Sequence, residues 1–160
     1  IYTKCKILDT RKTTPGFRYP EKWAVLIGGG LNHRMGLFDA ILIKDNHIDS
    51  SDTIEKAILS VEGYLKKNNF KIPVYIEVRN KEELNEVLKH TWIDRIILDN
   101  MSIHDTRESV LYANGSFLIE SSGNITKKNI RDYAETGVDF VSMGSITHSA
   151  SIIDMSLVKI

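Results

Sequence analysis

The sequence predicts an α/β fold in which parallel strands alternate with helices. Short apolar runs rich in β-branched residues recur six times, and segments with helical periodicity lie between them. Several of these runs are apolar at consecutive positions, which is typical of strands buried on both faces. The last four runs begin 21–22 residues apart, the length of one compact βα unit. The expected strands are residues 5–8, 40–43, 74–78, 95–98, 117–120 and 139–143.

Polar side chains at the ends of these strands favour one of two parallel architectures. An open doubly wound sheet and a barrel both fit the alternation, and six units are fewer than the eight of a complete (β/α)₈ barrel. Each expected strand ends in polar residues that its apolar body does not require. A barrel would gather these groups around one mouth, whereas an open sheet would spread them along an edge. We therefore expect an incomplete, about six-stranded α/β barrel that forms one domain over residues 1–160.

Start and stop signals place the helices between the strands. Asp52 followed by Glu55 is a capping-box-like start for one helix, and Asn80 followed by Glu83 marks the start of the next. Gly28 is expected to lie just past the end of an earlier, short helix. The expected helices are residues 20–28, 54–65, 80–88, 102–114 and 126–136.

Composition argues against several classes of function. Of the 160 residues, 42% are hydrophobic and 26% charged, with 21 basic and 21 acidic side chains. Without a basic stripe or an aromatic platform, nucleic-acid binding is not expected. Residues 1–50 carry 8 Lys and Arg against 5 Asp and Glu, which suits a small anionic ligand. A single Cys5, no long apolar run and no signal peptide favour a cytoplasmic protein without a membrane span.

Charged residues at the strand ends are the candidate site. Glu77 is the sharpest signal, because an acid between apolar neighbours is rarely buried without a partner. Lys44, taken alone, could equally be a solvated lysine, and Asp99 could equally be a turn or helix-capping residue. Arg11 and Lys12 follow the first strand and bring two cations to the same end of the sheet. Together these residues predict a site for a ligand with several negative charges.

Two turns after later strands are candidates for binding phosphate. Ser122-Gly123-Asn124 and Met143-Gly144-Ser145 place small residues where backbone N–H groups are exposed before an expected helix. Gly28-Gly29-Gly30 follows a helix rather than a strand, so it does not predict dinucleotide binding. Glu77 and Asp99 could hold Mg²⁺ beside a pyrophosphate or could hydrogen-bond to sugar hydroxyls, and both interpretations remain open.

Six segments of the chain, in order, resemble quinolinate phosphoribosyltransferase, the carboxylating nicotinate-nucleotide pyrophosphorylase. They are DTRKTTPGFR, EKWAVLIGGGLNHRMGLFDAILIKDNHI, IEV, ILDN, SSGNIT and VSMGSITHSA. The resemblance implies an enzyme of NAD biosynthesis that joins quinolinate to phosphoribosyl pyrophosphate, releases CO₂ and pyrophosphate, and uses Mg²⁺. It also implies an incomplete α/β barrel preceded by a small α/β sandwich domain, and a homo-oligomer that is at least a dimer.

The resemblance also implies roles for the cationic residues. Arg11, His33 and Arg34 match positions that hold the two quinolinate carboxylates. Arginine suits such a task because its planar guanidinium forms paired hydrogen bonds with a carboxylate. Lys12 and Lys44 match lysines at the mouth of the barrel that face pyrophosphate and substrate.

The remaining implied roles fall on acids and turns. Glu77 and Asp99 match acids near the ribose hydroxyls and Mg²⁺. The implied phosphate-binding residues are Ser122, Gly123, Asn124 and Gly144. Asn124 departs from the resemblance, because many members have a second glycine there, and this leaves the geometry of the turn open.

The family's N-terminal domain has no counterpart in these 160 residues. We therefore expect a piece of a longer protein that has little or no activity alone and exposes apolar surface. Two alternatives remain open: a related nicotinate phosphoribosyltransferase, or a non-catalytic fragment that binds a ligand or serves in assembly.

Overall fold

A computed structural model describes residues 3–159, which form a six-stranded sheet whose paired strands are all parallel. The strand order is β1-β6-β5-β4-β3-β2, so β2 to β6 lie side by side in chain order and β6 pairs with β1. The six expected strands are confirmed, and their ends differ from expectation by at most two residues. They are Lys6–Leu8 (β1), Ile41–Ile43 (β2), Val74–Val78 (β3), Arg95–Asp99 (β4), Leu118–Ser122 (β5) and Phe140–Ser142 (β6).

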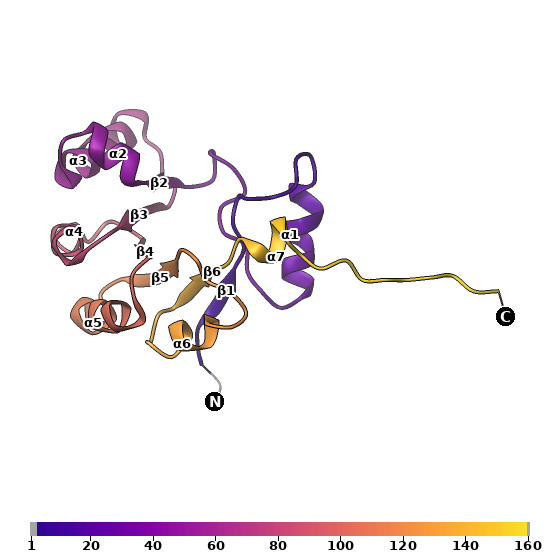
Figure 1. Cartoon of the computed structure of the whole chain (residues 1–160). Helices are drawn as coiled ribbons and strands as arrows, with labels where there is room; N and C mark the ends of the chain where they lie inside the picture. The colour runs from indigo at the N-terminus through magenta and orange to yellow at the C-terminus, as the bar shows by residue number, and fades with distance from the viewer. Residues whose placement is uncertain (1–2, 160) are drawn as a thin grey trace.

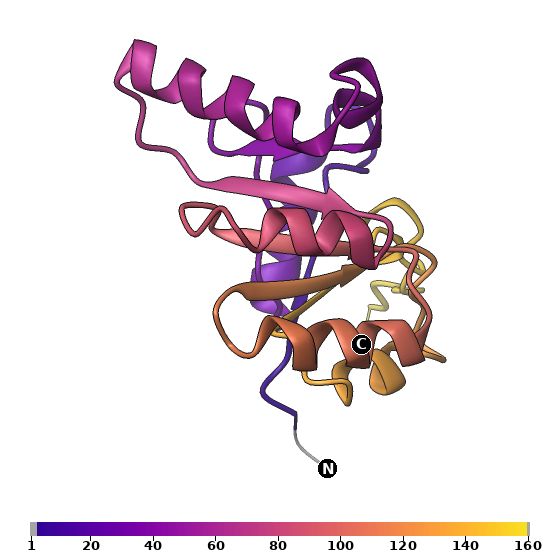
Figure 2. The ribbon, with the colours of Figure 1, turned by 90° about the vertical axis from the view of Figure 1, so that its left-hand side faces the viewer.

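Seven helices surround the strands within the described residues. Figure 1 shows the strands as an arc, with α2 to α6 along its outer side and α1 and α7 beyond β1 and β6. In Figure 2 the arc is seen from the side, with the strand arrowheads toward one edge. The helices are Arg18–Ile27 (α1), Asp45–Ser50 (α2), Ile54–Asn68 (α3), Lys81–Val87 (α4), Ile103–Ala113 (α5), Ile130–Ala134 (α6) and Ser145–His148 (α7).

The barrel is incomplete, as expected. Within residues 3–159, β1 and β2 are the two edges of the sheet and do not pair with each other. A short segment after α1 occupies the free edge of β1, where the Leu31 N–H donates to the Ile7 carbonyl at 2.8 Å. The Asp9 N–H returns a bond to the Leu31 carbonyl at 3.1 Å. This pairing brings the loop that follows Leu31 to the carboxyl end of the sheet.

Helix starts show one confirmed and one wrong expectation. Asn80 does begin α4, because its side chain accepts the Glu83 N–H at 2.8 Å. The expected start at Asp52 is wrong, since Thr53 is the N-cap of α3 and accepts the Lys56 N–H at 3.2 Å. Asp52 instead has a positive φ of 64° and forms an ion pair with Lys56. A β-region residue is needed at an N-cap, and Thr53 rather than Asp52 has that conformation.

Other helix boundaries also differ from expectation. Helix α1 begins at Arg18, and Gly28 retains a right-handed φ of −73°, so Gly29, with φ +86°, makes the left-handed turn. The helix expected over residues 126–136 is shortened to α6. Residues 127–129 form a turn instead of the first helical turn, and there the Asn129 N–H donates to the Thr126 carbonyl at 3.2 Å while the Asn129 side chain accepts the Thr126 N–H at 2.7 Å. The short helix α2 was not expected, whereas α7 lies directly after Gly144, where a helix was expected.

The hydrophobic core lies between the sheet and the outer helices. Ile76 of β3 and Ile96 of β4 are fully buried there, together with Ile58 of α3 and Leu84 of α4. Alternate residues of the same strands point the other way, into the barrel. This division leaves the interior of the barrel available for polar groups.

An arginine occupies that interior. The Arg95 guanidinium lies 4.6 Å from the ring centroid of Tyr75 and 4.1 Å from that of Phe140. It also donates to Glu120 at 2.9 Å, and the Glu120 side chain is almost fully buried. Two aromatic faces and a carboxylate thus stabilise a buried cation beneath the strand ends.

Two leucines on helices test whether α4 packs as described. Leu84 is fully buried, whereas Leu111 of α5 is 73% exposed. Leu84→Ala should lower the free energy of unfolding by about 2–5 kcal/mol, because it leaves a cavity in the core. Leu111→Ala should change it by less than about 0.5 kcal/mol. Urea denaturation followed by circular dichroism measures both, and equal effects would contradict this packing of α4.

Candidate functional site

One cavity of about 840 Å³ opens at the carboxyl ends of the strands. Its walls come from both edges of the sheet, from Glu77 within β3, and from the loops that follow the other five strands. The structure brings all the residues proposed from the sequence to this cavity. They are Arg11, Lys12, His33, Arg34, Lys44, Glu77, Asp99, Ser122, Gly123, Asn124 and Gly144. Their proximity is established, while their individual roles remain predictions.

The loop after β1 is held in place by Arg18. Its guanidinium donates to the Arg11 carbonyl at 3.1 Å, to Thr13 Oγ1 at 3.2 Å and to the Met35 carbonyl at 3.2 Å. Arg18 therefore joins the loop that carries Arg11 and Lys12 to the loop after Leu31. Its role is structural, because all three of these bonds go to other groups of the chain.

The side chain of His33 is neutral. Burial lowers its pKa to about 3, and the nearby cations Arg95 and Arg34 act in the same direction. His33 Nδ1 accepts the Arg34 backbone N–H at 2.8 Å, so the proton of the neutral ring is on Nε2. Nε2 lies 3.6 Å from Glu120 Oε2. His33 thus offers an N–H donor to the cavity but no positive charge.

Two guanidinium groups give the cavity its cationic wall. The pKa of Arg34 is lowered by burial and by the charge of Arg11 nearby. Arg34 Nη1 donates to the Ala40 carbonyl at 3.2 Å, which orients the side chain. Within residues 3–159, Arg11 Nε is buried and has no hydrogen-bond partner. Like charges held close together, one with a free donor, favour an anionic ligand between them.

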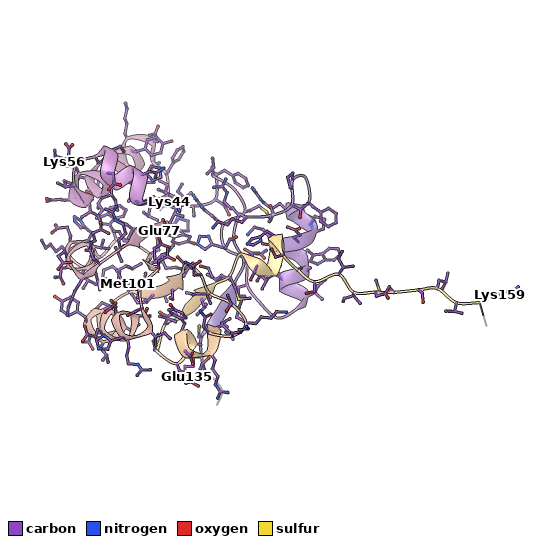
Figure 3. All side chains as sticks on the ribbon, in the orientation of Figure 1. Lys44, Lys56, Glu77, Met101, Glu135 and Lys159 are labelled. Atoms are coloured by element: carbon purple, nitrogen blue, oxygen red, sulfur yellow. The ribbon has the colours of Figure 1, made fainter. Side chains whose placement is uncertain are left out.

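A second part of the cavity wall combines a lysine with two acids. Lys44 Nζ lies 2.8 Å from Glu77 Oε1, and Figure 3 shows the two side chains side by side. Lys44 is therefore paired rather than simply solvated. Burial raises the pKa of Glu77, and the charge of Asp99 adds to this, while the bond to Lys44 opposes it. Asp99 accepts from Ser122 Oγ at 3.0 Å, and it is not a helix cap, because Ser102 begins α5.

These acids are few for a protein-bound metal. Within residues 3–159 no group of three or more His, Cys, Asp and Glu side chains is arranged to hold an ion. Glu77 and Asp99 are thus two carboxylates at the edge of a cavity. Mg²⁺ keeps several waters and commonly uses one or two protein carboxylates together with phosphate oxygens. The two residues fit that arrangement and do not form a closed metal cage.

The turn after β5 depends on left-handed backbone conformations. Gly123 has φ +90°, and a Cβ there would lie 2.2 Å from the Asn100 side chain. Asn124 has φ +51°, a region that asparagine tolerates better than most residues. Its Nδ2 donates to Asn100 Oδ1 at 2.9 Å. Asparagine at 124 therefore adopts a left-handed conformation of the kind that glycine also adopts, while phosphate binding by this turn stays a prediction.

The two candidate phosphate turns lead into different structures. The expectation of a helix directly after Asn124 is wrong, because α6 begins only at Ile130. Gly144 does directly precede α7, where its carbonyl accepts the backbone N–H groups of Thr147 and His148, each at 3.1 Å. Thr147 Oγ1 also donates to the Lys12 carbonyl at 2.7 Å, which joins this turn to the loop after β1.

Several residues at the site were not proposed from the sequence. Asn100, Glu120 and His148 line the cavity. Glu120 had a usable signal, because it is an acid at the end of an apolar run, as Glu77 is. Lys22 had none, since a lysine in a helix is ordinarily exposed to solvent. In the structure it is fully buried against Asp9.

Comparison with known proteins identifies the family. The model for the quinolinate phosphoribosyl transferase C-terminal domain matches residues 2–158. The chain belongs to the quinolinate phosphoribosyltransferase family. It is 46% identical over 165 residues to quinolinate phosphoribosyltransferase [decarboxylating] 2, mitochondrial, of Nicotiana glauca, covering 94% of this chain and 47% of that protein. It is 40% identical to the nicotinate-nucleotide pyrophosphorylase [carboxylating] of Mycobacterium leprae, covering 97% and 54%.

A solved structure agrees with this assignment. The nicotinate-nucleotide pyrophosphorylase of Francisella tularensis superposes with a TM-score of 0.88 at 47% identity, covering 96% of this chain and 53% of that one. This member of the quinolinate phosphoribosyltransferase family thus spans about half the length of the curated relatives it matches. Among the described residues, the helices are too short or too polar to cross a membrane.

Substitution of Gly123 should disturb the cavity more than substitution of a matched glycine. Gly123 and Gly115 both have a positive φ, so alanine at either costs about 1–2 kcal/mol in backbone strain. Only at 123 would the new Cβ also meet Asn100, because nothing lies within 4 Å at Gly115. Gly123→Ala should therefore lose more stability in urea and shift the Asn100 signal in an amide NMR spectrum. Equal losses with an unchanged Asn100 signal would contradict the contact.

Proposed function

We propose that the full-length protein transfers phosphoribosyl from phosphoribosyl pyrophosphate to quinolinate, with loss of CO₂ and pyrophosphate, to give nicotinate mononucleotide. The observation that carries the proposal is the cavity itself. In a chain of this family, two guanidinium groups, a lysine with two acids, and a glycine turn surround a single cavity. A pyridine dicarboxylate and a phosphorylated sugar together require this set of groups.

The dicarboxylate would bind at the cationic wall. Arg11 and Arg34 would each hold a carboxylate, since the guanidinium matches carboxylate geometry and relief of their mutual repulsion favours a dianion. His33 would add a neutral Nε2–H donor. Nicotinate has one carboxylate fewer than quinolinate. The paired guanidiniums therefore favour quinolinate as the substrate and argue against a nicotinate-specific enzyme.

Charge separates at the ribose when the C–O bond to pyrophosphate breaks. The anomeric carbon becomes positive and the leaving group gains negative charge. Lys12 and Lys44 would stabilise the leaving pyrophosphate, while Glu77 and Asp99 would orient the ribose hydroxyls and stabilise positive charge on the sugar. The turn at Ser122 and Gly123 would bind the phosphate of the ribose.

Decarboxylation follows from the bond formed at the ring nitrogen. When that nitrogen is quaternised, the ring can accept the electron pair of the breaking carbon–carboxylate bond. CO₂ then leaves, and the ring carbon takes a proton. The reaction needs no covalent intermediate with the protein. The residues' task is to bind, orient and stabilise charge.

Mg²⁺ is proposed as the cofactor. It would supply positive charge to the pyrophosphate oxygens. Glu77 and Asp99 are the residues that would hold it, in part through water, because they are the two acids beside the proposed pyrophosphate position.

Partners and location are also proposals. Helix α1 exposes Tyr19, Trp23, Leu26 and Ile27, and these apolar side chains are 47–73% exposed. The remaining half of the full-length protein or a second subunit would cover this face, consistent with a homo-oligomer that is at least a dimer. The isolated chain would then have little activity, and a non-catalytic fragment remains an alternative. A cytoplasmic location stays a prediction, because several plant relatives are named mitochondrial or chloroplastic.

Calorimetry with quinolinate tests the proposed substrate. Arg34→Ala should weaken quinolinate binding at least about 10-fold, because a hydrogen bond to a charged group contributes about 1.5–3 kcal/mol. Arg131→Ala, on an exposed arginine of α6 paired with Glu135, should leave the affinity unchanged. Nicotinate should bind the unmodified chain more weakly than quinolinate. Equal affinities for the two ligands, or an unchanged affinity in Arg34→Ala, would refute the assignment.

The metal proposal is tested with pyrophosphate in the presence and absence of Mg²⁺. Mg²⁺ should tighten binding to the unmodified chain. Glu77→Gln combined with Asp99→Asn should remove that gain while leaving metal-free binding as tight or tighter, because two negative charges are lost. Glu135→Gln combined with Asp132→Asn, two acids on α6, is the matched control. A gain from Mg²⁺ that survives in the first double variant would show that these acids do not hold the ion.

A further inference from the structure

We propose that Lys22 and Asp9 are positioning residues for the carboxylate-binding end of the cavity. Their buried ion pair holds the backbone of His33, and in this way it orients the side chains of His33 and Arg34. The inference rests on the proposed function, because that function makes those two side chains ligands of the substrate. Neither Lys22 nor Asp9 lines the cavity, so both act through other residues.

The ion pair joins α1 to the end of β1. Lys22 Nζ lies 2.5 Å from Asp9 Oδ1, and both side chains are 0% exposed. Removing two charges from water is unfavourable, and attraction between them offsets this only when further hydrogen bonds satisfy both groups. The groups that form those further hydrogen bonds therefore indicate which part of the structure the ion pair holds in place.

All of the further bonds go to one loop. Asp9 Oδ1 accepts the His33 backbone N–H at 2.8 Å, and Lys22 Nζ donates to the His33 carbonyl at 2.9 Å. The Asn32 side-chain amide, with its nitrogen toward the pair, donates to Asp9 Oδ2 at 2.7 Å. Both backbone polar groups of His33 are thus held by charged partners, and these are stronger hydrogen bonds than neutral ones.

The fixed backbone determines what the side chains do. The Arg34 N–H, in the peptide unit that the Lys22 bond holds, donates to His33 Nδ1 at 2.8 Å and so selects the Nε2–H tautomer. The Arg34 side chain leaves the same loop and reaches the Ala40 carbonyl at 3.2 Å. A shift of the loop would move both proposed carboxylate donors together.

A purely structural role predicts something different. Buried ion pairs can often be replaced by apolar residues of similar size without loss of stability. If Lys22 and Asp9 only join α1 to β1, an apolar pair would serve equally well. If they position the loop, an apolar pair would preserve the fold and lose the site, because it cannot hydrogen-bond to the His33 backbone.

The test is the double variant Asp9→Leu/Lys22→Met. Its matched control is Glu62→Leu/Lys66→Met, which removes an exposed ion pair on α3 by the same substitutions. We expect the first variant to fold, to exchange the His33 amide hydrogen at least about 100-fold faster, and to lose the Nε2–H tautomer signal in NMR. Quinolinate affinity should fall about 10- to 100-fold, as it does when supporting hydrogen bonds are removed from other sites, while pyrophosphate affinity changes less than about 3-fold.

Each outcome decides the proposal. Wild-type-like exchange and tautomer at His33 in the first variant would overturn it, whether or not the chain binds quinolinate. An equal fall in affinity for both ligands would also overturn it, because general loosening would then explain the effect. Should the double variant fail to fold, Asp9→Asn keeps the shape and removes the charge, and the same three readouts apply with the same outcomes.

The proposed function fails separately. If Arg34→Ala leaves quinolinate binding unchanged, the substrate assignment is wrong, whatever happens at His33. If Arg34→Ala abolishes binding while Asp9→Leu/Lys22→Met binds as the unmodified chain does, the substrate assignment stands and the positioning role is wrong.

Discussion

Parallel pairing of six strands in one curved sheet is the constraint on which the rest of the structure depends. Because β1 to β6 all run the same way, their carboxyl ends meet at a single mouth, and each strand contributes to the cavity from its own residues or from the loop that follows it. Residues as distant in the chain as Arg11 and Gly144 thereby line one cavity. The core on the outer side of the sheet holds the strands in register. The positions of the side chains in the cavity are therefore fixed by packing that lies away from any bound ligand.

Electrostatic imbalance distinguishes this cavity from an ordinary polar cleft. One wall holds the guanidiniums of Arg11 and Arg34 close enough to lower the pKa of the second. A second part of the wall holds Lys44 against Glu77, with Asp99 nearby. A folded protein maintains a like-charged pair such as Arg11 and Arg34 only where the surrounding structure determines it. The countercharge that the two guanidiniums lack is what the carboxylates of a ligand would bring.

Much of the fold and the site could be predicted from the sequence, because both depend on short-range patterns. Strands were marked by apolar runs, and Glu77 by its apolar neighbours. Failures arose where local backbone conformation or a longer-range partner decided the outcome. Thr53 rather than Asp52 begins α3 because backbone conformation, not residue type, selects the cap. Lys22 was missed because its burial depends on Asp9, which lies 13 positions earlier and on another element. His33 was expected among the cationic donors, and only its buried surroundings show that it is neutral.

Helix α1 has two faces with different tasks, and this makes it a point of thermodynamic linkage. On its inner face, Lys22 donates a hydrogen bond to the His33 carbonyl, while its outer face exposes Trp23 and its apolar neighbours to solvent. A protein surface that covers the outer face and prefers one placement of the helix would change the affinity of the cavity for its ligand. Reciprocity requires that the ligand change the affinity for that surface by the same factor. Association with that surface and ligand binding in the cavity would then both depend on the placement of α1.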